Sequence, residues 1–167
     1  AFVVGMLHAT HALTGNSPSK DYLMKEAIRV EQEVLSENVG SQDQTAAAHG
    51  GFNYIEFKQD KTINVTPVNL SSNRQLELEN HLMLFFTGFS RIASEVAKSK
   101  IANLETKKSE LQRIRAQVNE ALELLQSSSD IRGIGEMLHQ TWQYKRALSA
   151  KVSTEAIDSI YTQARAA

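Results

Sequence analysis

Apolar residues recur at helical spacing in two segments near the start of the chain. The first segment runs from Phe2 to Leu13, and the turn-forming residues 15–18 (GNSP) then end it. Ser19 or Asp21 can cap the second segment. Its apolar positions lie three or four residues apart, at Leu23, Ala27, Val30 and Val34. The pattern predicts two consecutive amphipathic helices.

A third, shorter helix is expected after residue 40. Residues 41–44 (SQDQ) fit a capping box in which Ser41 caps the helix and Gln44 reaches back to it. Three alanines at 46–48 favour helix, and a glycine pair at 50–51 can end it in the left-handed conformation. Asp43 falls in the first turn, where the helix dipole favours an anion, and we expect this acid to be buried.

Extended segments follow this helix. Residues 52–57 and 62–68 flank the polar sequence QDK at 59–61, which predicts a β-hairpin with Pro67 at an edge or a strand end. Residues 81–87 (HLMLFFT) form a continuous apolar run bounded by Gly88, which is typical of a strand buried on both faces. These strands, with helices between them, indicate an α+β fold.

From residue 92 onward the pattern is helical throughout. A long apolar stripe runs from Leu104 to Leu125, and SSSD at 127–130 then breaks the helix. We expect the next helix to bury a set of apolar residues that includes Leu138, and the last helix to begin at 153–155 and bury Ile160. The second half of the chain is therefore expected to be mainly helical. Its stripe could be covered within the chain or by a partner.

Composition narrows the range of functions. The chain has 167 residues, of which 41% are hydrophobic and 22% charged, as in an ordinary globular protein. A net charge of −1 gives no general attraction to nucleic acid or to an acidic membrane surface. The sequence has no cysteines, which is consistent with a cytoplasmic location, and no apolar run long enough to span a bilayer.

The most informative motif lies between Val39 and Phe57 and reads VGSQDQTAAAHGGFNYIEF. It resembles the segment that carries the catalytic aspartate in GHMP-family small-molecule kinases, such as galactokinase, homoserine kinase and mevalonate kinase. The galactokinase pattern is G-x-M-D-Q, and Gly40, Asp43 and Gln44 match it, while Gln42 stands in place of the methionine. Within the family, the bacterial D-glycero-D-manno-heptose 7-phosphate kinase group reads very similarly from Gln42 to Phe57.

The resemblance implies roles for two acids. Asp43 would be the catalytic carboxylate, which accepts or orients the proton of the acceptor hydroxyl. Glu31 lies twelve residues earlier, at the family's spacing for a glutamate that helps hold Mg²⁺. Glu33 and Glu37 are nearby acids, so the second assignment stays open. Without the resemblance, each residue is an ordinary helix acid.

The resemblance also implies binding residues. Gln42 and Gly51 would contact the substrate, and Ala1 would adjoin a glycine- and serine-rich loop that binds the phosphates of ATP. Residues 87–91 (TGFSR) resemble a T-G-x-x-R motif of heptose kinases, in which Arg91 could bind a substrate phosphate through two hydrogen bonds. The alternative for Arg91 is a surface arginine in a turn.

The domain organisation follows from the same resemblance. Residues 1–70 would be the rear part of the N-terminal GHMP kinase domain, and residues 71–167 the mainly helical start of the C-terminal domain. The family's phosphate loop and second glycine-rich motif have no counterpart here, so we expect the chain to be an internal fragment.

The function that the resemblance implies is ATP- and Mg²⁺-dependent phosphorylation of a sugar or sugar-phosphate hydroxyl. The anomeric hydroxyl of a heptose 7-phosphate is the first expectation, and a galactokinase or fucokinase is the alternative within the family. A homodimer is also compatible with the resemblance. The alternative of another class is a non-catalytic assembly module that uses the stripe from Leu104 to Leu125 against a partner.

Overall fold

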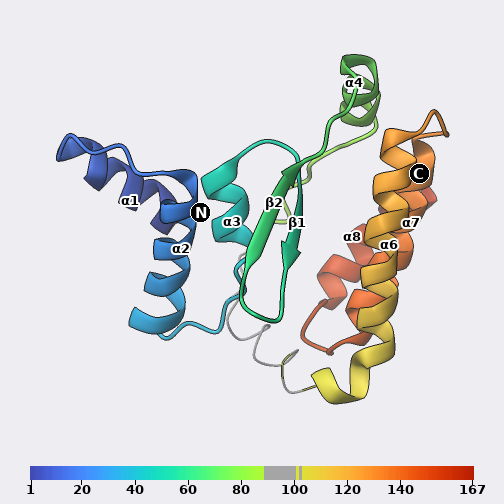
Figure 1. The fold of residues 1–167 in the computed structure, drawn as a ribbon. Helices are drawn as coiled ribbons and strands as arrows, with labels where there is room; N and C mark the ends of the chain where they lie inside the picture. Colours follow the sequence, from blue (N-terminus) through green and yellow to red (C-terminus); the bar gives the residue numbers. More distant parts are fainter. Residues whose placement is uncertain (89–100, 102) are drawn as a thin grey trace. The chain divides into compact units, whose positions relative to one another are not determined.

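The computed structural model describes residues 1–88, 101 and 103–167 of the chain (Figure 1). These residues divide into two compact units, Ala1–Val68 and Asn69–Ala167. Helices predominate in both, and the strands of the described residues form one two-stranded sheet, in the first unit. The mixture of helices with a small sheet agrees with the expected α+β class.

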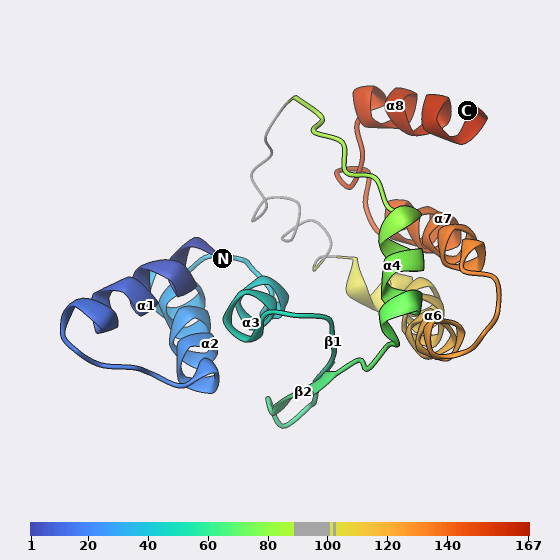
Figure 2. The same ribbon diagram turned by 90° about the horizontal axis from the view of Figure 1, so that it is seen from above.

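The first unit contains the helices α1, α2 and α3, which Figure 2 shows next to one another, and a small apolar core lies between them. Their bounds are α1 Phe2–Leu13, α2 Lys20–Arg29, the π-helical turn η1 Val30–Val34 that continues α2, and α3 Gln42–His49. Ser19 caps α2 as expected, because its hydroxyl accepts a hydrogen bond from the Tyr22 N–H at 3.1 Å. Gly50 ends α3 with a positive φ of 63°, also as expected.

The core of this unit comes from part of the predicted helical stripes, since Phe2, Leu13 and Val34 are exposed. Its buried members are Val3, Val4, Leu23 and Ala27, against which Leu7, Val30 and Ala48 pack. Each fully buried branched side chain contributes about 1.5–3 kcal/mol of transfer free energy. The core therefore holds α1, α2 and α3 together.

The predicted hairpin is confirmed. Strand β1, Asn53–Phe57, pairs antiparallel with β2, Ile63–Pro67, so that Asn53 lies opposite Pro67 and Phe57 opposite Ile63. The Asp60 carboxylate stabilises the turn by accepting a hydrogen bond from the Thr62 N–H at 2.9 Å. The same bond lowers the pKa of Asp60.

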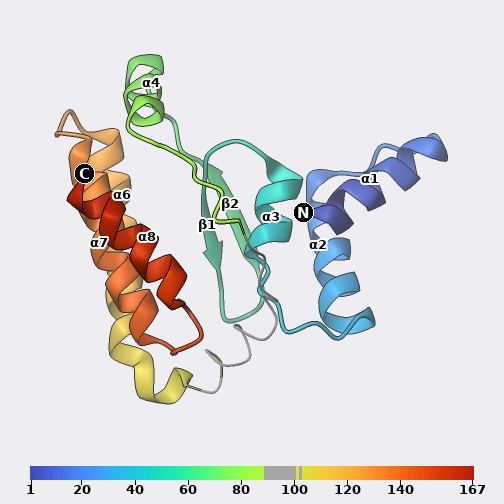
Figure 3. The same ribbon diagram turned by 180° about the vertical axis from the view of Figure 1, so that it is seen from behind.

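The second unit consists of helices, which Figure 3 shows from behind. Their bounds are α4 Ser72–Asn80, the 3₁₀ turn η2 Leu104–Lys107, α6 Lys108–Gln126, α7 Arg132–Ala147 and α8 Glu155–Ala166. Helices α6 and α7 lie side by side, and the buried apolar residues of the unit are Leu125, Ile131, Leu148 and Val152. Thr154 caps α8 by accepting a hydrogen bond from the Ile157 N–H at 3.3 Å.

Arg74 joins α4 to the end of α6. Its guanidinium donates to the carbonyls of Leu124, at 2.8 Å, and Leu125, at 3.2 Å, and pairs with Glu77 at 2.8 Å. The last carbonyls of a helix have no partner within it, so a cation there satisfies them and opposes the helix dipole. Arg74 is therefore a structural residue, because each nitrogen of its guanidinium already donates a hydrogen bond within the second unit.

The predicted buried strand at 81–87 is wrong. Residues 82–87 are irregular and highly exposed, with Leu84 99% and Phe86 91% accessible. An apolar strand buried on both faces needs neighbouring strands and covering layers. Among the described residues, β1 and β2 are the only strands, and they pair with each other.

The prediction that Leu138 and Ile160 are buried in the second unit is also wrong. Leu138 is 56% exposed and Ile160 is 43% exposed. Both lie on helices with one covered face, so an apolar residue at the edge of the stripe stays in water. The predicted stripe from Leu104 to Leu125 is likewise mixed, since Leu125 on α6 is buried while Leu104 on η2 and Val118 on α6 are exposed. Within the described ranges, no helix is long and apolar enough to cross a membrane.

Candidate active site

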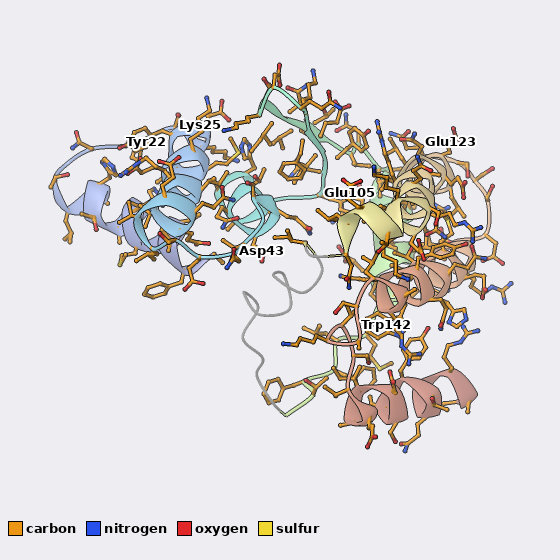
Figure 4. The ribbon with its side chains drawn as sticks, turned by 90° about the horizontal axis from the view of Figure 1, so that it is seen from below. Tyr22, Lys25, Asp43, Glu105, Glu123 and Trp142 are labelled. Carbon is orange, nitrogen blue, oxygen red and sulfur yellow. The ribbon has the colours of Figure 1, made fainter. Side chains whose placement is uncertain are left out.

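Asp43 lies in the first turn of α3 with its side chain in solvent, where Figure 4 labels it. The expectation that it is buried is wrong. The turn itself is firmly held, because the buried Thr45 hydroxyl donates to the Ser41 carbonyl at 2.6 Å. Within the described ranges, Asp43 forms no ion pair with a lysine, arginine or histidine. The Asp43 carboxylate is thus carried by a rigid helix turn and has no basic partner among the described residues.

Glu31 lies on the π-helical turn that continues α2. The Leu35 N–H reaches back five residues to the Val30 carbonyl at 2.9 Å, which defines this wide turn. Glu31 continues the face of α2 that carries Met24 and Ala27, both buried, so its half-buried side chain is directed toward the other helices. The π turn ends the helix, because the residues that follow it, up to residue 40, are irregular.

The described structure brings Glu31 and the Asp43 turn together through Gln44. The Gln44 side-chain amide donates a hydrogen bond from Nε2 to Oε2 of Glu31. Gln44 is only 1% exposed and is one of the largest fully buried side chains. The two acids singled out from the sequence therefore belong to one helix–helix contact, although they are twelve residues apart.

The capping box predicted at 41–44 is wrong. Ser41 precedes α3, but its side chain does not cap the helix, and Gln44 turns to Glu31 instead of returning to Ser41. The Ser41 hydroxyl instead accepts a hydrogen bond from Gln32 Nε2 at 3.2 Å, and the same amide group donates to the Val39 carbonyl at 3.0 Å. In a capping box the Gln44 side-chain oxygen would accept a hydrogen bond from the Ser41 N–H, whereas here the Gln44 side chain donates from Nε2 to the Glu31 carboxylate.

A second contact fixes the opposite end of the same helix pair. Lys20 at the start of α2 donates from Nζ to the carbonyl of His49 at the end of α3, at 2.6 Å. Asp21 also lies close, with its carboxylate 3.3 Å from His49 Nε2. The two helices are therefore antiparallel and tied at both ends, which sets the position of Asp43 relative to Glu31.

The nearest cation on α2 is already occupied. Arg29 forms two hydrogen bonds to Glu26, at 2.9 and 2.6 Å. This pairing lowers the pKa of Glu26 and raises that of Arg29. Glu31 itself forms no ion pair with a lysine, arginine or histidine among the described residues.

Glu31 is suited to a divalent cation by its surroundings. Mg²⁺ takes oxygen ligands, and proteins commonly hold it with one or two carboxylates together with phosphate oxygens and water. One oxygen of Glu31 accepts from Gln44, which leaves the other for a cation. The part of the chain that the structure describes contains no group of three histidines or acids that could hold a metal by itself. Glu31 could therefore contribute one carboxylate ligand to a cation.

The other residues expected at the site are placed as follows. Gln42 is exposed next to Asp43, and Gly51 is exposed with a positive φ of 73° just beyond the end of α3. Ala1 is exposed at the start of α1. Arg91 lies outside the described residues. Gln44 is the residue that sequence reasoning assigned wrongly, since its match to the family motif gave no sign of its contact with Glu31.

Comparison with solved structures identifies the class of fold. No protein-family model matches the chain. The chain superposes on a D-glycero-D-manno-heptose 1-phosphate kinase from Bacteroides thetaiotaomicron with a TM-score of 0.61 and 24% sequence identity. The match covers 86% of this chain and 41% of that one. The described residues therefore have the fold of part of a sugar-phosphate kinase.

A curated relative narrows the resemblance. The chain is 32% identical over 162 residues to the D-glycero-alpha-D-manno-heptose 7-phosphate kinase of Campylobacter jejuni. The alignment covers 95% of this chain and 47% of that protein, so the chain spans about half the length of the relative it matches. The resemblance to heptose 7-phosphate kinases, expected from residues 42–57, is thereby confirmed over nearly the whole chain.

Proposed function

We propose that the full-length protein is an ATP-dependent kinase that phosphorylates a hydroxyl group of a sugar phosphate. The observation that carries this proposal is the joint placement of Asp43 and Glu31 by Gln44, in a chain similar to a heptose 7-phosphate kinase. In phosphoryl transfer, the protein acts chiefly by positioning the reactants and neutralising charge. An exposed, unneutralised carboxylate on a rigid helix turn beside a second carboxylate is suited to that task.

Asp43 acts on the acceptor in this proposal. The acceptor oxygen attacks the γ-phosphorus of ATP, the bond from that phosphorus to the ADP oxygen breaks, and the hydroxyl proton passes to Asp43. Glu31 would help to hold Mg²⁺, and the cation would supply charge neutralisation at the phosphates when bound. Gln42, which precedes Asp43 in the sequence, and Gly51, which follows the end of α3, border the acceptor.

The finer assignments extend the proposal. The acceptor is the anomeric hydroxyl of a heptose 7-phosphate, Arg91 binds the phosphate that the substrate already carries, and Ala1 adjoins the loop that binds ATP. Residues 1–70 and 71–167 belong to the N-terminal and C-terminal domains of a GHMP kinase. A homodimer and a cytoplasmic location remain predictions. The alternatives are a galactokinase or fucokinase and a non-catalytic assembly module.

The test is ADP release by the full-length protein across a panel of acceptors with Mg²⁺ present. The panel contains heptose 7-phosphate, the unphosphorylated heptose, galactose and fucose. We expect turnover with heptose 7-phosphate and at least a tenfold lower kcat/KM for the unphosphorylated heptose, because a lost phosphate contact costs about 1.4 kcal/mol or more. Preference for galactose or fucose would favour the alternative kinases. A folded protein that neither binds ATP nor turns over any acceptor would favour the assembly module.

A further inference from the structure

Only one of the two polar atoms of the Gln44 side chain has a hydrogen-bond partner among the described residues. Its Nε2 donates to Glu31, whereas its Oε1 is buried and has no hydrogen-bond partner among the described residues. A buried acceptor without a partner is unfavourable, because it loses the hydrogen bonds that it would form with water. An apolar side chain of the same length would avoid that cost. The glutamine therefore lowers the stability of the fold at this position unless its amide has a function.

The hydrogen bond to Glu31 indicates what the function of the Gln44 amide is. The amide N–H can only donate, and an ionised carboxylate can only accept, so the contact fixes which way round the Gln44 amide lies. The partner is also neutral. A lysine or arginine at this position would neutralise Glu31, whereas an amide orients the carboxylate and leaves its charge available for a cation.

The surrounding structure makes Gln44 a rigid support. Its own side chain is 1% exposed, and α3 is tied to α2 at its other end by Lys20 and His49. Glu31 sits on a π turn, where the backbone is less regular than in α2 itself. Gln44 on the rigid helix α3 therefore holds Glu31, which lies on the less regular turn η1.

We propose that Gln44 is a positioning residue that holds the Glu31 carboxylate in the orientation needed to bind a divalent cation. This inference rests on the proposed function, in which Glu31 is a ligand of Mg²⁺. Gln44 itself touches neither cation nor substrate. Groups that hydrogen-bond to metal ligands typically change metal affinity by about 10–100-fold when they are removed.

The test measures cation affinity directly in the full-length protein. Binding of Mn²⁺ is followed by electron paramagnetic resonance with ADP present, and the Mg²⁺ dependence of kcat is measured in parallel. Gln44→Met keeps the length of the side chain and removes only its polar atoms. We expect its Mn²⁺ affinity to fall about 10-fold or more, with kcat at saturating Mg²⁺ changed only a few-fold.

Thr45→Val is the matched control. It alters an equally buried neighbour on the same helix and removes a hydrogen bond, but it leaves Glu31 and Gln44 untouched. We expect its Mn²⁺ affinity to match the wild type even if its thermal stability is lower. An equal loss of affinity in both variants would mean that Gln44 acts only through general stability, which would overturn the proposal.

Glu31→Gln separates failure of this inference from failure of the proposed function. If Glu31→Gln leaves Mn²⁺ affinity unchanged, Glu31 is not a metal ligand and the proposed function loses its cation site. If Glu31→Gln abolishes binding while Gln44→Met binds normally, only the positioning role is overturned. If Gln44→Met does not fold, Gln44→Asn replaces it, since the shorter amide cannot reach Glu31, and the same loss of affinity is expected.

Discussion

Two adjacent residues show what the sequence could and could not predict at the scale of single side chains. Asp43 and Gln44 follow each other at the start of α3, yet Asp43 lies in solvent and Gln44 is buried. Local rules placed Asp43 correctly in the first turn. They failed for Gln44, because its partner Glu31 is thirteen residues away and a local pattern does not report such contacts.

The exposed acid Asp130 makes the stability of the protein depend on pH in the acidic range. Hydrogen bonds from the Arg132 side chain lower the pKa of Asp130 from its ordinary value of 3.8 to about 2. A carboxyl group whose pKa falls on folding stabilises the protein above its unfolded pKa, and this contribution is lost as pH falls through the folded pKa. We expect the Tm advantage of the wild type over Asp130→Asn to be present at pH 5 and to vanish between about pH 4 and pH 2.

The measurement is a thermal unfolding series for both proteins across that range. Glu136→Gln is the control, because it removes another exposed acid, whose carboxylate lies 3.8 Å from Arg165. A Tm difference between the wild type and Asp130→Asn that stays constant from pH 5 to pH 2 would contradict the prediction.

At the scale of elements, periodicity predicted most of the helices and the hairpin, because each depends on local spacing and on caps such as Ser19 and Thr154. The failures depend on neighbours. The run at 81–87 has the composition of a buried strand, but a strand exists only where other strands pair with it. The exposure of Leu138 and Ile160 likewise depends on which helices cover them.

Two glycines in α7 offer a matched pair for testing helix packing. A β-carbon at Gly135 would meet open space, whereas one at Gly133 would come within 2.6 Å of Leu124 Cδ1. Alanine is better than glycine inside a helix by about 0.5–1 kcal/mol. We expect Gly135→Ala to stabilise the protein by that amount, and Gly133→Ala to stabilise it less or to destabilise it.

Urea unfolding of the two variants checks the result. Both substitutions add one methyl group to the same helix, so the difference between them reports the contact with Leu124. Equal stabilisation by both variants would show that α6 and α7 are not packed as closely at this point as the structure has them.

At the scale of the whole molecule, the chain combines two compact units with an exposed apolar segment at 82–86. Apolar patches of this kind bind hydrophobic dyes and promote association. We expect the 167-residue chain to enhance the fluorescence of such a dye, and the double variant Leu84→Ser with Phe86→Ser to lose most of that enhancement. Equal dye fluorescence with and without the substitutions would contradict the exposure of this segment.

The central claim is that Asp43 is the catalytic carboxylate of a sugar-phosphate kinase, and it concerns the full-length protein. The most direct test is the kcat of ADP release for Asp43→Asn, with heptose 7-phosphate as acceptor. The control is Asp60→Asn, which changes another acid of the same unit in the hairpin turn. We predict that kcat falls about 100-fold or more for Asp43→Asn, because proton transfer by a positioned group contributes that much, while Tm is unchanged and Asp60→Asn stays active. A kcat for Asp43→Asn within a few-fold of the wild type would show that Asp43 is only a helix residue.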